Sequence, residues 1–327
     1  MSDYPLNPDL YSDDVVREPI RAGFGRGLRD AGARDERIVA LCADLTESTQ
    51  MSLFQKEFPD RFIEVGVAEQ NLVTVAAGMA HAGKIPFTSS YAAFSPGRNW
   101  EQIKTTAALN DQPVKIVGSH AGLNVGPDGA THQMLEDISL MRVMPNMVVV
   151  APGDSVEAEK ATIAIAANGK PSYLRLARDK TPVFSTVDSP FEIGRAYVLR
   201  QGTDVTLAGT GTQTYELLVA AKILAEEGVD AEVLHVPTIK PLDADTILAS
   251  VRKTGRIVTA EEAQRAGGLG GAVAELLGEQ LPRPIGRLGV DDRYGESGTP
   301  AEVLEAYRLT GQHLADSIRS FVDRTFD

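Results

Sequence analysis

Three short segments of this 327-residue chain carry residue types that could do chemistry. The first contains Glu69, which stands between a short apolar run at 61–65 and an apolar stretch at 72–80 that is rich in small residues. These flanking patterns predict a strand and a buried helix. A carboxylate at the start of a helix lies where the helix dipole favours negative charge, and in a desolvated site it is suited to proton transfer. From spacing alone, an ordinary N-terminal capping glutamate is the better interpretation.

The second segment is a glycine-rich loop that contains His120, Asp128 and His132. It follows a predicted strand at 114–119, and histidines on a loop at the edge of a rigid sheet can act as general acids, general bases or hydroxyl ligands. A metal site is disfavoured because no His or Cys cluster with ligand spacing accompanies them. For His132 taken alone, an ordinary hydrogen-bonded loop residue is an equal alternative.

The third segment holds two aromatic residues, Tyr91 and Phe94, just past a predicted strand at 85–90. Aromatic residues in such a position more often pack in a core than carry a cofactor. Their flat rings could nevertheless orient a planar ligand. The residues alone leave both interpretations open.

Apolar, β-branched runs that alternate with helical stretches must position these residues. The predicted strands lie at 37–43, 62–67, 85–90, 114–119, 147–151 and 172–177, with helices such as 98–109 and 155–168 between them. Unbroken apolar strands separated by helices indicate an α/β fold with a parallel sheet covered on both faces, and ligands bind such sheets beyond the carboxyl ends of the strands. The residues that follow the first four strands are Asp44, Glu69, Tyr91 and His120. We therefore expect these four at one edge of the sheet.

A second α/β unit follows a segment rich in Pro, Ser and Thr. The pattern divides the chain into an acidic N-terminal tail at 1–14, a first domain at 15–180, a linker at 181–193 and a second domain at 194–327. Each domain is predicted to contain a mostly parallel sheet covered by helices. Gly209 and Gly211 follow a strand but lack the third glycine of a dinucleotide fingerprint, so they indicate a structural turn.

Composition excludes several classes of protein. Lys and Arg total 32 against 45 Asp and Glu, and the net charge of -13 argues against nucleic acid or an anionic membrane as a main partner. The single cysteine, Cys42, excludes an intrachain disulfide and a multi-cysteine metal site. No apolar run reaches the roughly 18 residues that cross a bilayer. We expect a cytoplasmic protein.

The residue patterns of these segments resemble those of a known family. The runs VGVAEQN (65–71), AAGMAHAGKIPFTSSYAAF (76–94) and GPDGATHQ (126–133) resemble the transketolase group of thiamine diphosphate enzymes. The resemblance extends from about Arg17 to Arg178, and the second domain agrees in length and pattern. It implies that 15–180 is the pyrimidine-binding domain and that 194–327 is the transketolase-like C-terminal domain.

The resemblance also implies roles for residues near the cofactor. Glu69 would hydrogen-bond the pyrimidine ring nitrogen of thiamine diphosphate and thereby activate the cofactor. Phe94, with Tyr91 beside it, would pack against the aminopyrimidine ring. Asp44 matches a family aspartate near the cofactor, although a helix N-cap is a strong alternative for it.

A further set of residues would bind the sugar. His120, Asp128 and His132 match residues that hold hydroxyl groups, and the two histidines would help to move protons during carbon–carbon cleavage. The residues that match the family's contacts to the sugar phosphate are Arg17, Ser48 and Arg178. A guanidinium is suited to phosphate, although a surface arginine is the ordinary interpretation for each taken singly.

One family motif is missing from this sequence. The family binds the diphosphate through Mg²⁺ with a Gly-Asp-Gly motif and a downstream asparagine, in an N-terminal domain of full-length members. The near match, Gly126-Pro127-Asp128-Gly129, already lies in the sugar-binding loop. We therefore expect the beta subunit of a split transketolase, with no metal ligands of its own, in an α2β2 assembly whose alpha subunit binds the diphosphate and Mg²⁺. Such an enzyme would transfer two-carbon units between sugar phosphates in the pentose phosphate pathway.

Three alternatives stay open. A 1-deoxy-xylulose-5-phosphate synthase shares much of the wording, but that family tends to carry an arginine at the position of His120. The beta subunit of the decarboxylating component of a 2-oxo acid dehydrogenase shares the subunit split but usually lacks the pattern from Asp128 to Gln133. A non-catalytic paralogue would be expected to have lost Glu69, Phe94 or His132, and all three are present.

Overall fold

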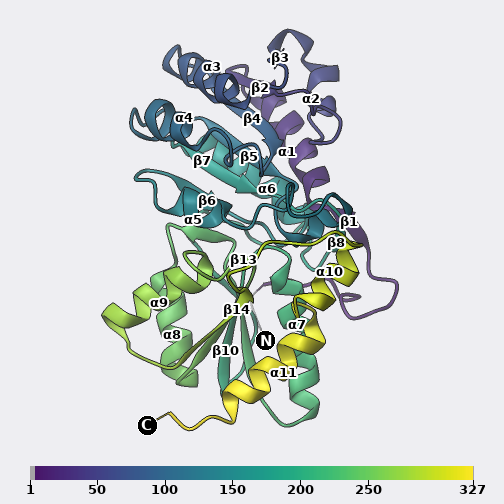
Figure 1. Ribbon diagram of the computed structural model, residues 1–327, viewed down its shortest axis with the longest axis vertical. Helices are drawn as coiled ribbons and strands as arrows, with labels where there is room; N and C mark the ends of the chain where they lie inside the picture. The colour runs from purple at the N-terminus through teal and green to yellow at the C-terminus, as the bar shows by residue number, and fades with distance from the viewer. Residues whose placement is uncertain (1–3, 327) are drawn as a thin grey trace.

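The computed structural model describes residues 4–326, which form two α/β units that lie one above the other in Figure 1. The upper unit contains a seven-stranded sheet. Its strands, in spatial order, are β12 (Thr238–Lys240), β6 (Val148–Val150), β7 (Ser172–Arg175), β5 (Lys115–Ser119), β4 (Ile85–Tyr91), β2 (Ile38–Cys42) and β3 (Phe62–Glu64). Every neighbouring pair is parallel except β12 and β6.

Helices cover both faces of this sheet because successive side chains of a buried strand point to opposite faces. On β2, Ile38, Ala40 and Cys42 enter the core beneath α1 and α6. The alternate residues Val39 and Leu41 enter the core beneath α3 and α5. The helices of this unit are α1 (Ile20–Arg34), α2 (Ser52–Glu57), α3 (Glu69–His81), α4 (Trp100–Gln102), which continues as a π-helical segment (Ile103–Ala108), α5 (Asp137–Arg142) and α6 (Ser155–Ala167).

The lower unit contains a five-stranded sheet. Its spatial order is β14 (Ile285–Val290), β13 (Ile257–Gln264), β10 (Val205–Gly209), β11 (Ala231–His235) and β9 (Tyr197–Arg200), with only β9 antiparallel to its neighbour. The helices of this unit are α7 (Gln213–Glu226), α8 (Ala244–Thr254), α9 (Leu269–Gln280), α10 (Pro300–Ala306) and α11 (Gly311–Val322).

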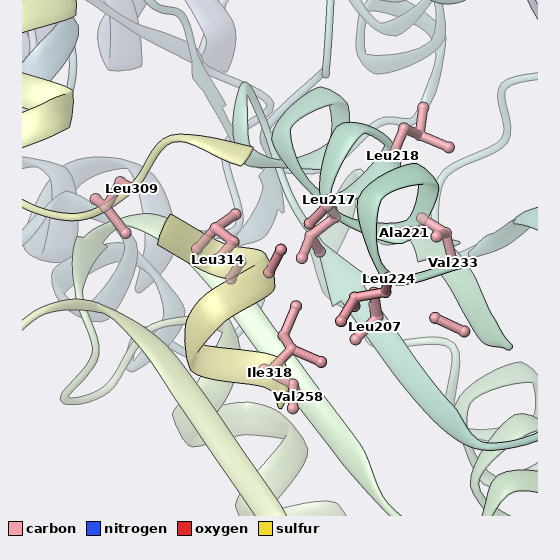
Figure 2. Packing of buried hydrophobic residues seen from close by; sticks show 14 of the residues in the cluster. Leu207, Leu217, Leu218, Ala221, Leu224, Val233, Val258, Leu309, Leu314 and Ile318 are labelled. Atoms are coloured by element: carbon pink, nitrogen blue, oxygen red, sulfur yellow. The ribbon is translucent and has the colours of Figure 1, made fainter. Parts of the chain in front are cut away.

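One face of the lower sheet is covered by α7 and α11. Figure 2 shows leucine side chains of α7 and the side chains of Leu314 and Ile318 from α11 in one cluster with Leu207 and Val258 of the strands. The opposite face is covered by α8 and α9, whose residues form a separate core that includes Val251. The predicted class, α/β with two domains built on mostly parallel sheets, is confirmed.

The two units share structural elements. The short strand β12 follows the lower unit's β11 in sequence, yet it pairs with β6 at the edge of the upper sheet. A two-stranded ribbon of β1 (Arg17–Pro19) and β8 (Lys180–Pro182) joins the two ends of the upper unit. The units are therefore bound by backbone pairing as well as by side-chain packing.

The described part of the predicted N-terminal tail packs between the units. Leu6 forms a β-bridge with Ser185, and Tyr4 and Leu10 are buried in the core of the lower unit. The backbone N–H of Asn7 donates to the carbonyl of Phe184 at 2.8 Å. The domain boundaries given above stay predictions.

Candidate active site

The carboxyl ends of β4 and β5 bring the aromatic pair and the first histidine together. Tyr91 is in register with Ser119 on the neighbouring strand, so His120, the next residue, lies against the Tyr91 ring. The ring centroids of Tyr91 and His120 are 3.8 Å apart, and the planes of the two rings are stacked at an angle of 25°. Because parallel strands end at the same edge, the register of two strands fixes this stacked pair.

Glu69 is the first residue of α3, and its side chain is only 2% exposed. Ala68 precedes the helix and no side chain caps it, so the capping interpretation of Glu69 is wrong. Its Oε2 accepts a hydrogen bond from Arg98 Nη1 at 2.8 Å, and its backbone carbonyl accepts one from Asn99 Nδ2 at 2.8 Å. No hydrogen bond from the residues between 4 and 326 reaches Oε1, which leaves one carboxylate oxygen free for a ligand.

A run of ring contacts connects Glu69 with the loop that is predicted to bind the sugar. The guanidinium carbon of Arg98 lies 5.2 Å from the centroid of the Phe94 ring, and Phe94 stacks on Tyr91 with centroids 6.0 Å apart. His132 meets the Phe94 ring edge-on at 5.4 Å. The structure therefore brings Glu69, Phe94, Tyr91, His120 and His132 into one connected cluster, in which the aromatic pair is half-buried.

His120 is buried and has a positive φ of 56°, which is uncommon for a residue with a side chain. Its Nδ1 lies 2.9 Å from Ser119 Oγ. Burial, with further contributions from Arg21, Arg178 and His132, lowers the pKa of His120 to about 3. The imidazole is consequently neutral near pH 7, and because Nδ1 pairs with Ser119, a ligand hydroxyl would hydrogen-bond Nε2, which donates or accepts depending on the tautomer.

A carboxylate from the lower unit holds the loop that is predicted to bind the sugar. Glu262 on β13 accepts a hydrogen bond from the backbone N–H of Asn124 at 2.5 Å through Oε1, and one from Thr212 Oγ1 at 2.6 Å through Oε2. Gly122, with φ of 83°, permits this approach, because a Cβ there would lie 2.5 Å from Glu262 Oε1. Burial raises the pKa of Glu262.

The far end of the same loop is held by Gln133. Its Nε2 donates to the carbonyls of Gly126 and Glu296, at 3.2 and 2.9 Å respectively. The second of these acceptors belongs to the segment that precedes α10 in the lower unit. Both ends of the loop are therefore fixed by contacts that cross between the units.

The structure brings only some of the residues that are predicted to bind the sugar phosphate close together. Arg178 Nη1 lies 3.7 Å from Asp128 Oδ2 and donates to the carbonyl of Val125 at 2.5 Å. Arg21 donates to the carbonyl of Arg178, and the two arginines line a cleft of about 360 Å³. Arg17 lies outside this lining and interacts electrostatically with Glu216.

The other two predicted ligand contacts lie elsewhere on the same unit. Ser48 is half-buried in the turn before α2 and makes no hydrogen bond with a residue of the described chain. Asp44 is exposed with φ of 58°, and its backbone N–H donates to Glu64 Oε1 at 2.8 Å. Met51, and not Asp44, precedes α2, so the helix-cap interpretation of Asp44 is wrong.

Three functional candidates were not predicted from the sequence: Arg98, Arg21 and Glu262. Arg98 follows Phe94 by four residues and Arg21 follows Arg17 by four, and this helical spacing is the only local signal for either. Glu262 belongs to a pair of adjacent glutamates, and glutamates usually lie in solvent. Their partners are distant in sequence, so spacing could not reveal these contacts.

The cavity beside Glu69 suits an aromatic amine. A surface cleft of about 510 Å³ is lined by Val67, Glu69, Asn71, Arg98 and neighbouring residues. It offers a free carboxylate oxygen, which matches the hydrogen-bonding edge of an aminopyrimidine, and Arg98 of its lining lies over the Phe94 ring, which does not itself line the cleft. Within 4–326, no group of three or more His, Cys, Asp or Glu side chains could hold a metal ion.

Comparisons with known proteins agree with this geometry. Residues 19–183 match the transketolase pyrimidine binding domain, and residues 194–314 match the transketolase C-terminal domain. The chain belongs to the transketolase family. The predicted resemblance to the C-terminal part of a split transketolase is confirmed as well.

Individual relatives show how far the similarity extends. A transketolase C-terminal section of Methanocaldococcus jannaschii is 43% identical over 306 residues, which cover 93% of this chain and 96% of that protein. A 6-deoxy-6-sulfo-D-fructose transketolase subunit of a Clostridium species is 42% identical, covering 91% and 92%. Among solved structures, a split-gene transketolase described as an inactive β4 tetramer superposes with a TM-score of 0.87 at 42% identity, covering 93% of this chain and 98% of that one.

Other members of the same enzyme group are also similar. A 1-deoxy-D-xylulose-5-phosphate synthase of Symbiobacterium thermophilum is 37% identical over 92% of this chain, and the match spans 46% of that longer protein. The transketolase family depends on thiamine diphosphate.

The described residues include no helix that is long and apolar enough to cross a membrane.

Proposed function

We propose that this chain is the beta subunit of a thiamine diphosphate-dependent transketolase that moves a two-carbon ketol unit from a ketose phosphate to an aldose phosphate. An alpha subunit would bind the diphosphate and Mg²⁺ in an α2β2 assembly in the cytoplasm. The observation that carries the proposal is the continuous series of contacts from Glu69 through Arg98, Phe94 and Tyr91 to His120 and His132. It unites a buried carboxylate, a ring platform and hydroxyl ligands at one sheet edge.

The residues near Glu69 would hold the cofactor. When bound, thiamine diphosphate supplies the nucleophilic carbon and the electron sink for carbon–carbon cleavage. Glu69 would hold or release a proton at the pyrimidine nitrogen through its free Oε1, from a site where burial excludes water. Phe94 and Tyr91 would orient the ring through their faces, and Asp44 would lie near the cofactor.

The loop residues would hold the sugar. His120, kept neutral by burial, would hydrogen-bond a substrate hydroxyl, while His132 and Asp128 would bind others and assist proton movement. Arg178 would bind the phosphate end, which agrees with its position beside Arg21 in one cleft. Arg17 and Ser48 would complete the phosphate site, although neither contacts this cleft in the structure.

Several relatives support the need for a partner. The proteins from Methanocaldococcus and Clostridium that align over nearly their whole length are named as a section and as a subunit of a transketolase. A sulfofructose enzyme among them indicates that the charged end of the physiological sugar need not be a phosphate.

A second candidate is a 1-deoxy-xylulose-5-phosphate synthase, because such enzymes are also among the relatives. His120 favours sugar transfer, since that synthase family tends to carry an arginine at this position. The two activities differ in their donor substrate, which is a ketose phosphate for the transketolase and pyruvate for the synthase.

Reconstitution distinguishes these activities. The purified chain would be mixed with a candidate alpha subunit, thiamine diphosphate and Mg²⁺, and assayed with ketose phosphates plus aldose phosphates, with sulfofructose, and with pyruvate. We expect ketol transfer only in the complete mixture. Turnover by this chain without a partner, or activity with pyruvate alone as donor, would contradict the proposal. Glu69→Gln should abolish turnover while size-exclusion chromatography still detects the assembly.

A further inference from the structure

Arg98 contacts both groups that the proposed function assigns to the aminopyrimidine ring. Its Nη1 donates to Glu69 Oε2 at 2.8 Å, and its guanidinium carbon lies 5.2 Å from the centroid of Phe94. The second distance is within the range of a cation–π interaction. One side chain therefore satisfies the carboxylate and lies against the aromatic platform.

The buried carboxylate needs such a partner. The Glu69 side chain is 2% exposed, and an ionised carboxylate is costly to bury without a compensating charge. Among the described residues, Arg98 is the one cation within ion-pair distance of Glu69. Asn99 binds the backbone carbonyl of Glu69 and therefore does not stabilise the carboxylate directly.

The arginine can be displaced more easily than the glutamate. Its side chain is 51% exposed, and its only side-chain hydrogen bond to a described residue is the one to Glu69. A guanidinium at the surface regains hydration when it leaves, so the cost of separating the pair falls on the buried Glu69, which the incoming ring would hydrogen-bond. Swinging Arg98 into solvent would thus break one hydrogen bond and one ring contact, and it would uncover Glu69 and Phe94 together.

We propose that Arg98 is a displaceable substitute for the cofactor's pyrimidine ring. It neutralises Glu69 and covers Phe94 while the site is empty, and it moves into solvent when the ring enters. This inference rests on the proposed function for the identity of the ring. The competing possibility is that Arg98 permanently positions Glu69 through Oε2, but that role does not require the contact with Phe94.

Binding of a cofactor fragment tests the displacement. The full-length chain would be titrated with the free hydroxymethylpyrimidine fragment of thiamine and followed by NMR. We expect Arg98→Gln to bind the fragment about 3- to 10-fold more tightly than the unmodified chain, because no ion pair or cation–π contact has to be broken. The matched control is Lys104→Gln, which removes an exposed cation of the following π-helical segment that lies over Trp100, and it should bind as the unmodified chain does. Equal, weaker or undetectable binding to Arg98→Gln would overturn the proposal.

Thermal unfolding of the same chains gives a second measurement. Arg98→Gln should lower the Tm by about 1–3 °C, because Glu69 is left unpaired, and adding Glu69→Gln should recover that loss. Additive effects of the two substitutions would also overturn the proposal, since they would mean that the two side chains do not interact.

The outcome separates this inference from the proposed function. If Glu69→Gln leaves fragment binding unchanged in the Arg98→Gln background, the ring does not bind at Glu69 and the proposed function is wrong at that residue. If Glu69→Gln removes binding while Arg98→Gln binds no more tightly than the unmodified chain, only the displacement by Arg98 is wrong.

Discussion

Glu262 accepts a hydrogen bond from the backbone N–H of Asn124 at 2.5 Å, so a carboxylate of the C-terminal domain holds the loop that carries His120 and Asp128. The same side chain accepts a hydrogen bond from Thr212 and is almost completely buried. The geometry of the proposed sugar site therefore depends on the second domain, although every predicted sugar ligand belongs to the first.

Replacing Glu262 should disturb the position of the loop and lower the catalytic activity. Glu262→Ala leaves the Asn124 N–H and the Thr212 hydroxyl without their acceptor, which should cost about 1–3 kcal/mol of unfolding free energy. Misplacement of the loop should lower kcat/KM for the donor sugar by about 10- to 100-fold. Glu262→Gln retains one acceptor and should recover part of both losses. The control, Glu279→Ala, alters an exposed glutamate of α9. Full activity of the alanine variant would show that the loop is held by other contacts.

Glu261 should make stability depend on pH. It is fully buried, it accepts hydrogen bonds from the backbone N–H groups of Leu269 and Gly270 at the start of α9, and burial raises its pKa to about 7. Since its pKa in the folded protein exceeds that of an ordinary glutamate, 4.5, the folded state binds more protons than the unfolded state between these values. Its contribution to stability is therefore complete below about pH 4.5 and is lost as the pH rises through about 7.

Denaturant unfolding between pH 4 and pH 8 would measure this dependence. Glu261→Gln is less stable at low pH because one backbone N–H loses its acceptor, by about 1–3 kcal/mol. The difference between the two proteins should shrink as the pH rises. A difference that is constant over this interval would mean that Glu261 does not titrate there.

His120 should act as a neutral hydrogen-bonding group. Its pKa of about 3 keeps the imidazole uncharged at every pH at which the enzyme is expected to work. His120→Ala should reduce kcat/KM for the sugar by about 10- to 100-fold through the loss of one or two hydrogen bonds, and His120→Asn should recover part of that loss. His81→Ala, at the exposed end of α3, is the matched control. An acidic limb near pH 6 that disappears in His120→Asn would contradict the assignment of a neutral side chain.

The sequence predicted those parts of the fold that depend on local pattern. Buried strands such as β2 and β6 were recognisable as unbroken apolar runs, and Glu69 was correctly expected at the start of a helix. The strand β12 was not predicted, because three residues carry too little periodicity and their partner is β6, nearly ninety residues earlier.

The site was predictable to the extent that its residues follow successive strands. The stacking of Tyr91 on His120 results from the register of β4 and β5, which apolar pattern does not specify. The contacts of Glu69 with Arg98 and of Asn124 with Glu262 join residues 29 and 138 positions apart, so only the tertiary structure reveals them. The match to the family supplied the remaining roles, which await the experiments described above.

The buried hydrogen bond between Glu157 and His235 should be a main determinant of contact between the two units. His235 Nε2 lies 2.7 Å from Glu157 Oε2, and its Nδ1 lies 2.7 Å from Thr214 Oγ1, with both members of the pair almost completely buried. Glu157 lies in the first turn of α6 in the upper unit, whereas His235 ends β11 in the lower unit. Removal of one member leaves the other polar group buried without its partner, which is the costly case for a buried pair.

We expect His235→Ala to lower the unfolding free energy of the full chain by about 3–5 kcal/mol, and the double variant His235→Ala/Glu157→Gln to lose less, because no carboxylate then stays unpaired. Urea unfolding followed by circular dichroism would measure both values. The control is the pair of His313 and the exposed Glu305, at 3.5 Å, where Glu305→Gln should change stability by less than about 0.5 kcal/mol. If His235→Ala is no more disruptive than that control, the units are held together by β12, the N-terminal segment and apolar packing, and the buried pair contributes little to their association.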